Sequence, residues 1–289
     1  MIECPSHSAR AALVVAHPGH ELRVYGWLEA TRPRVFVLTD GSGRSTRSRI
    51  ASTDDVLAGA GATRGDIYAR LTDTDFYTAI LDHEFDLFKR LADELADELI
   101  REKILCVAGD AVEGYNPAHD VCRLIINAAV EMASRALGER VANFEFTLVG
   151  RPDECREDER ASALWLQLDD AAFARKLTAA RNYPELAAEV EAALSGAASV
   201  GLRAHPDLAA SSGLNRVAVA DTSASGETFR VECLRPAREF GQEFGVVPFY
   251  EQYGERQVAA GYYTRVLRYH EHMLPLAEAL RSHIEKGDR

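Results

Sequence analysis

The chain has 289 residues, of which 47% are hydrophobic and 27% charged, as expected for a globular protein with a substantial core. Its 45 acidic residues outnumber the 33 basic ones, which leaves a net charge of -12. This balance argues against a nucleic-acid partner, which favours a basic surface. No apolar run approaches the ~18 residues of a membrane-spanning helix, so we expect no membrane partner.

Two further features concern the cellular compartment. The amino terminus has no basic segment followed by an apolar stretch, so no signal peptide is expected. The five cysteines are scattered and include no C-x-x-C pair, which favours a reducing environment. We therefore expect a cytoplasmic protein.

Short apolar runs alternate with longer segments of helical spacing through the first 150 residues. In chain order, the patterns predict a strand over 11–16, a helix over 20–30, a strand over 35–39, a helix over 52–62, a short strand and a loop over 66–77, a helix over 83–103, a strand over 104–108, a helix over 119–137 and a strand over 142–149. This alternation predicts an α/β fold, a Rossmann-like three-layer α/β/α arrangement with a mostly parallel sheet.

The pattern changes beyond residue 150. Residues 159–196 are rich in Ala, Leu and Glu and predict two helices. Strands are predicted over 216–220 and 228–234, and residues 249–284 are predicted to be mostly helical. We expect residues 1–150 to form the core that carries the site, and residues 151–289 to be an elaboration packed on the same domain.

Two of the predicted strands end in loops that carry polar, metal-binding side chains. The first strand runs into His17 and His20, and the strand over 104–108 runs into Asp110 and, further on, His119. In open α/β sheets, ligands bind at the carboxyl ends of the strands. The sequence therefore predicts a site where these two strand ends meet.

His17, His20 and His119 are the predicted metal ligands. A catalytic zinc takes three protein ligands and leaves one position for water. His20 lies near the start of a predicted helix, where the helix dipole favours the neutral imidazole that a metal needs. The chain has nine histidines, and an H-x-x-H spacing also arises by chance. The position of these three after well-formed strands favours the metal site.

Four carboxylates are expected near the same rim: Asp40, Asp110, Glu113 and Asp120. Such a group can orient a ligand imidazole or act as a general base. For each of them the alternative is a helix cap or a solvated loop charge. Asp120 in particular lies in a first helical turn, where acidic residues are favoured for electrostatic reasons alone.

The loop after the second strand is polar and rich in glycine, and it carries Arg44 and Arg47. These side chains can bind an anionic or hydroxylated substrate. The loop lacks the remaining spacing of a dinucleotide or phosphate-binding fingerprint, so we do not expect a nucleotide. Asp40 and Tyr115, on the same two exit loops, complete the residues expected to contact substrate.

Residues 16–21, Ala-His-Pro-Gly-His-Glu, resemble the Ala-His-Pro-Asp-Asp-Glu signature of the PIG-L/LmbE family, zinc-dependent deacetylases of N-acetyl amino sugars. Residues 114–120, Gly-Tyr-Asn-Pro-Ala-His-Asp, are similar to that family's second signature, His-Pro-Asp-His. Residues 39–41, Thr-Asp-Gly, match its glycine-containing loop. The resemblance spans at least the first 150 residues and continues loosely to Tyr183 and Pro184.

The chain also departs from the family at functional positions. The resemblance implies that the general base is the first Asp of the signature, and here that position is Gly19. The second Asp, a zinc ligand, is replaced by His20, which can still bind metal. The first His of the second signature, which assists the transition state, is replaced by Asn116, and its neighbouring Asp by Ala118. The three ligand positions survive while the acid–base groups are lost.

The resemblance implies a divalent-metal hydrolase that removes an N-acyl group from an amino sugar or related small metabolite. Three neutral ligands leave the ion its full charge, so water ionises with less help from a base. The relocated base would be Asp110, Glu113 or Glu21, and Asn116 would donate to the oxyanion. Zinc is the expected metal, with Fe²⁺ or another divalent ion as the alternative.

Two other readings remain open from the sequence. One is a non-hydrolytic metal enzyme in a specialised biosynthetic pathway. The other is a catalytically silent binding protein on the same fold. The expected partner is a small molecule in either case, and a homo-oligomer is left open.

Overall fold

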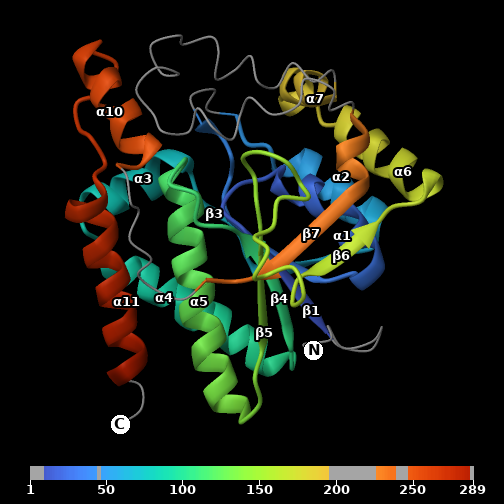
Figure 1. Cartoon of the computed structure of the whole chain (residues 1–289). Coiled ribbons are helices and arrows are strands. Elements are labelled where there is room, and N and C mark those ends of the chain that lie inside the picture. Colours follow the sequence, from blue (N-terminus) through green and yellow to red (C-terminus); the bar gives the residue numbers. More distant parts are fainter. Residues whose placement is uncertain (1–9, 44–46, 195–225, 239–246, 287–289) are drawn as a thin grey trace.

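The computed structural model describes residues 10–43, 47–194, 226–238 and 247–286. A seven-stranded sheet runs through its centre in the order β3-β2-β1-β4-β5-β7-β6 (Figure 1). Its strands are β1 (Ala11–Val15), β2 (Arg34–Thr39), β3 (Thr63–Leu71), β4 (Cys106–Asp110), β5 (Ala142–Phe146), β6 (Leu164–Gln167) and β7 (Val231–Pro236). The first five are parallel, whereas β7 runs antiparallel to both β5 and β6. This is the predicted α/β fold with a mostly parallel sheet.

Helices cover both faces of the sheet. They are α1 (Tyr25–Thr31), α2 (Ile50–Ala60), α3 (Asp73–Leu81), α4 (Phe85–Arg101), α5 (Pro117–Leu137), α6 (Asp170–Arg181), α7 (Ala187–Leu194), α10 (Phe249–Ala259) and α11 (Leu274–Lys286). Shorter helical turns are η1 (His20–Val24), η3 (Pro184–Leu186), η5 (Gly226–Arg230) and the π-helical η6 (Tyr269–Met273). Figure 1 shows α3, α4, α5 and α11 on one side of the sheet and α1, α2 and α6 on the other. None of the helices in the described ranges is both long and apolar enough to span a bilayer.

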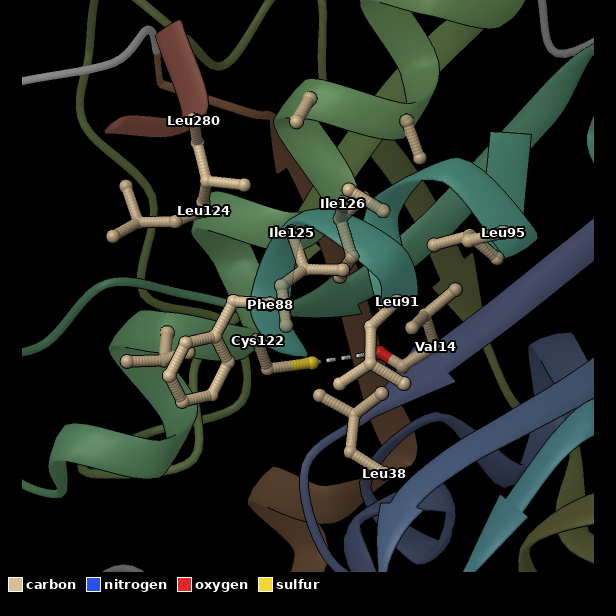
Figure 2. Packing of buried hydrophobic residues seen from close by; sticks show 14 of the residues in the cluster. Val14, Leu38, Phe88, Leu91, Leu95, Cys122, Leu124, Ile125, Ile126 and Leu280 are labelled. Carbon is tan, nitrogen blue, oxygen red and sulfur yellow. Dashed lines mark hydrogen bonds between the residues drawn. The ribbon is translucent and has the colours of Figure 1, made fainter. Parts of the chain in front are cut away.

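The central strand β1 is buried on both faces, as its unbroken apolar sequence predicts. Ala12 and Val14 face the core under α4 and α5, while Leu13 and Val15 face the core under α1 and α2. Figure 2 shows the first core, where side chains of α4 and α5 pack over Val14 and Leu38. These two cores hold the carboxyl end of β1 at a fixed place in the sheet.

Most elements lie where the sequence predicts them, and two differ. Residues 66–77 were expected to be a short strand and a loop, but β3 is longer and Asp73–Leu81 forms helix α3. Thr72 starts this helix with a capping box, in which its hydroxyl accepts from the Asp75 amide and Asp75 accepts from the Thr72 amide. Residues 159–196 contain α6 and α7 as predicted, and also the unpredicted strand β6. The strand predicted over 216–220 lies outside the described residues.

Glu232 of the carboxy-terminal strand β7 is hydrogen-bonded to the first turn of α1. Its buried carboxylate accepts the amides of Gly26 and Trp27, both at 2.8 Å, in the first turn of α1. Lys176 of α6 donates to the same carboxylate at 2.7 Å. Burial lowers the pKa of Lys176, although the charge of Glu232 opposes this shift. Glu232 thus joins α1, α6 and β7 in a single buried contact.

We predict that Glu232→Ala destabilises the protein by about 3–5 kcal/mol, because it leaves Lys176 buried and unpaired. Urea unfolding measures the loss. Glu157→Ala is the control, since this side chain is 98% exposed and should change stability by less than about 0.5 kcal/mol. A Glu232 variant as stable as this control would contradict the role assigned to the carboxylate.

Candidate functional site

The turn after β1 brings two histidines to the carboxyl edge of the sheet. β1 ends at Val15, Gly19 adopts a left-handed conformation with φ of 104°, and η1 begins at His20. Glu21 shapes this turn, since its buried carboxylate accepts the Gly19 amide at 2.8 Å and the Thr53 hydroxyl at 2.8 Å. Burial raises the pKa of Glu21 despite these hydrogen bonds. Glu21 therefore holds the turn in place.

The structure brings His17, His20 and His119 together. The ring centroids of His17 lie 5.3 Å from those of both His20 and His119, and the last two are 4.6 Å apart. The rings meet edge to face, with interplanar angles of 67° to 89°. His17 and His119 are buried, and His20 is partly exposed. We call these three residues the histidine triad.

Two members of the triad are oriented by acidic or hydroxyl partners. His20 Nδ1 lies 2.9 Å from Asp110 Oδ2, and that oxygen also accepts the Ala16 amide at 2.8 Å. His17 Nδ1 lies 2.8 Å from the Thr39 hydroxyl and 3.0 Å from Asp73 Oδ1. Metal-binding histidines are typically held in this way, because a carboxylate on one ring nitrogen leaves the lone pair on the other.

Asp73 is a site residue that the sequence reasoning missed. Burial opposes its ionisation, but hydrogen bonds from His17, Thr39 and the Gly43 amide bring its pKa below the ordinary range. The residue was assigned to a loop because the start of α3 was not recognised. The Thr72-x-x-Asp75 capping box is the signal that would have placed a helix terminus, and Asp73 within it, at this point.

His119 lies in the first turn of α5 and completes the triad. Its Nδ1 is buried without a hydrogen-bond partner. Burial lowers the pKa of His119, and the neighbouring imidazoles His20 and His17 lower it further. The ring is therefore neutral, which is the state that binds a metal. An unpartnered buried nitrogen is costly, and a bound ion would remove the cost.

The spacing of the triad suits zinc. Zn–N distances of about 2.0–2.1 Å in tetrahedral geometry place the centroids of two ligating rings about 5 Å apart, as they are here. Among the residues that the structure describes, no group of three or more His, Cys, Asp or Glu side chains is already arranged to hold a metal ion.

The predicted catalytic carboxylates have structural partners. Asp110 is fully buried and committed to Ala16 and His20. Glu113 accepts the amides of Leu148 and Val149 at 3.0 and 3.1 Å, and burial raises its pKa to about 7.

Asp120 holds the loop that carries Glu113. Its Oδ1 accepts the amides of Glu113 and Gly114 at 3.0 and 3.3 Å. Its Oδ2 is buried without a hydrogen-bond partner. Burial raises the pKa of Asp120 to about 8.

Asn116 caps the amino terminus of α5. Its Oδ1 accepts the Ala118 amide at 2.8 Å and the Tyr77 hydroxyl at 2.9 Å. Two donors on one atom identify it as the oxygen, which leaves the amide NH₂ free to donate elsewhere. Asn116 is the N-cap residue, with an extended backbone, and His119 follows in the first turn of the helix.

The residues expected to contact substrate do not form a cluster like that of the three histidines. Asp40 Oδ1 accepts the Ser42 amide at 3.0 Å within its own loop. Arg47 is exposed, and Arg44 lies outside the described residues. Tyr115 is 38% exposed and stacks on Phe249 of α10, with ring centroids 4.8 Å apart. The sequence had not indicated that α10 reaches this rim.

Gly19 lies in close contact with the segment that precedes α7. Besides its positive φ, a Cβ on Gly19 would lie 2.5 Å from Leu186 Cδ1. Leu186 belongs to η3, just before α7, so this part of the chain packs directly against the turn. A side chain at position 19 would displace it.

We predict that Gly19→Ala costs more stability than Gly138→Ala. Gly138 also has a positive φ, of 65°, but no atom lies within 4 Å of its Cβ position. Both variants carry the cost of the left-handed backbone, about 1–2 kcal/mol, and only Gly19→Ala adds about 1–3 kcal/mol of overpacking. Urea unfolding compares the two, and Leu186→Ala should narrow the difference. Equal costs would contradict the contact.

Comparisons with known proteins were made on sequence and on structure. No protein-family model matches the chain, and no relative is found among curated proteins. The structure is similar to the A40926 pseudoaglycone deacetylase Dbv21, with a TM-score of 0.46 and 15% identity, covering 81% of this chain and 99% of that one. A deacetylase of teicoplanin biosynthesis in its bog complex gives 0.44 and 12%, covering 69% and 94%. The zinc-inhibited teicoplanin deacetylase Orf2 gives 0.42 and 11%, covering 68% and 94%. Likenesses of this size leave the family of the chain open.

Proposed function

We propose that the chain is a zinc-dependent amide hydrolase that removes an N-acyl group from an amino sugar or a related small molecule. The observation that carries this proposal is the histidine triad, with ring centroids 4.6–5.3 Å apart. Asp110 and Asp73 orient two of its rings, and His119 Nδ1 has no hydrogen-bond partner. The resemblance of residues 16–21 to a deacetylase signature points to the same chemistry.

His17, His20 and His119 are the residues that hold the ion. Imidazole suits zinc, and three protein ligands leave a position open for substrate or water. When bound there, zinc supplies Lewis acidity toward an amide carbonyl and lowers the pKa of water. Asp110 and Asp73 act as positioning residues, since each accepts from the Nδ1 of a ligand and fixes its ring.

All three carboxylates considered as a relocated base have hydrogen-bond partners, and Glu113 is chosen for its pKa. Glu21 accepts hydrogen bonds within the turn after β1, Asp110 binds Ala16 and His20, and Glu113 accepts the amides of Leu148 and Val149. Glu113, with its pKa raised to about 7 by burial, is poised for proton transfer near neutral pH. Three neutral ligands leave more positive charge on the ion than a set that includes an anionic ligand. The pKa of bound water would then be lower, and a weaker base would suffice.

The amide NH₂ of Asn116 is the proposed hydrogen-bond donor to the substrate carbonyl oxygen. Tyr77 and the Ala118 amide fix its Oδ1, so its NH₂ is held in a single orientation at the start of α5, the helix that carries His119. Preorganised donors of this kind act on the charge that develops on the carbonyl oxygen in the transition state.

We predict that the protein takes up about one zinc per chain and that His119→Ala abolishes this uptake. Elemental analysis measures the metal, and hydrolysis of N-acetylglucosamine and N-octanoylglucosamine measures activity. His119→Ala should lower kcat/KM by about 100-fold or more, because outer-shell partners alone contribute 10–100-fold. His270→Ala is the control, since His270 is exposed. Zinc uptake unchanged in His119→Ala would refute the ligand assignment, and iron with no hydrolysis would favour the non-hydrolytic reading.

A second prediction concerns Asn116. Asn116→Ser keeps a side chain that caps α5 but removes the amide donor. We expect kcat to fall by about 10²–10³-fold with KM nearly unchanged, and thermal stability to fall modestly because the Tyr77 hydroxyl loses its acceptor. Steady-state kinetics on the better of the two substrates checks this. A kcat within a few-fold of the parent would show that Asn116 serves only as a cap.

A further inference from the structure

An apolar cavity of about 260 Å³ lies beside the histidine triad. His20 and Gly19 form the wall that faces the triad, so the cavity adjoins the proposed metal site. The remaining walls come mainly from α6 and from the η3–α7 segment, which pack against each other. Figure 1 shows α7 beyond the upper end of the sheet, on the same side as α6.

The helical part of this wall is apolar because of its spacing. Leu186, Val190, Ala193 and Leu194 recur at the interval that places side chains on one face of a helix. All four are half-buried and line the cavity. Across from them lie Leu177 and Ala180 of α6, so apolar residues of two helices border the space.

Four charged residues line the cavity, namely Arg23, Arg49, Lys176 and Glu189. Two of them, Arg23 and Lys176, have their head groups engaged elsewhere. Arg23 donates to the carbonyl oxygens of Thr147 and Gly150. Lys176 donates to the Arg23 carbonyl oxygen at 2.9 Å and to Glu232 at 2.7 Å. These side chains therefore offer their aliphatic stems to the cavity and keep their charges away from it. Most of the remaining lining is apolar, which suits a hydrocarbon chain.

The volume of the cavity indicates the length of the aliphatic chain that it can accommodate. A water molecule takes about 30 Å³ of liquid volume, and a methylene group is of similar size, so the cavity holds about eight such groups. An acetyl group would leave most of this space unfilled. A linear chain of medium length would fill it.

We propose that this cavity binds the acyl chain of the substrate, so that the enzyme acts on amides of medium-length aliphatic acids in preference to acetamides. This inference rests on the proposed function, because it takes the scissile carbonyl to lie at the histidine triad. Gly19 contributes by letting Leu186 pack on the turn, which sets the cavity wall beside His20.

Chain-length dependence of binding tests the proposal without requiring turnover. Calorimetry would compare acetate, hexanoate, octanoate and decanoate on the protein with and without added zinc. Affinity should rise about fourfold per methylene, the gain expected for burying each one, and should level off near octanoate or decanoate. Equal affinity for acetate and octanoate would overturn the proposal.

Two variants locate the bound chain. Ala193→Phe places a ring in the cavity and should cut octanoate affinity at least tenfold while leaving acetate unchanged. Ala188→Phe makes the same change on an exposed position of α7 and should have no effect. Ala180→Leu narrows the cavity from α6 and should act as Ala193→Phe does. Octanoate affinity unchanged in both cavity variants would overturn the assignment.

The two proposals fail separately. One outcome is hydrolysis of N-acetylglucosamine at a rate equal to or above that of N-octanoylglucosamine, with carboxylate affinity independent of chain length. This outcome would refute the acyl-chain site and support the hydrolase. Chain-length-dependent binding without hydrolysis of either substrate would keep the acyl-chain site and remove the hydrolase.

Discussion

The carboxylate of Asp110 joins the sheet to the site, and the rest of the arrangement depends on it. It is fully buried at the end of β4, where one oxygen accepts both the Ala16 amide and His20 Nδ1. Gly109, just before it, has no room for a side chain, because a Cβ would lie 2.4 Å from the Val14 carbonyl oxygen. The neighbouring strand ends are thus locked together, and the orientation of a histidine follows from the pairing of β1 with β4.

A second buried carboxylate gives the carboxy-terminal elements their part in the site. Glu232 binds the first turn of α1 and Lys176 together, which holds α6 against the turn that carries His20. Through α6 and the segment that follows it, Leu186 reaches Gly19. The glycine at position 19 and the apolar wall beside His20 are therefore two aspects of one packing arrangement.

Much of the fold could be predicted because it depends on local pattern. Apolar runs marked β1, β2 and β4, an alternating pattern marked β5, and helical spacing marked α1, α2, α4 and α5. Helix α3 was missed because a capping box, rather than an apolar stripe, signals its start. Strand β6 was missed because it is short and lies at the edge of the sheet, with half-exposed residues that carry little pattern.

The sequence by itself determined the parallel α/β sheet and the two strand exits that carry His17, His20 and His119, since strand ends and side-chain types are local properties. Only the tertiary structure decided what surrounds them. It paired His17 with Asp73 across 56 positions of the chain and drew the Asp110 carboxylate to His20. Such contacts depend on which elements become neighbours when two cores are buried, and no local pattern records that choice.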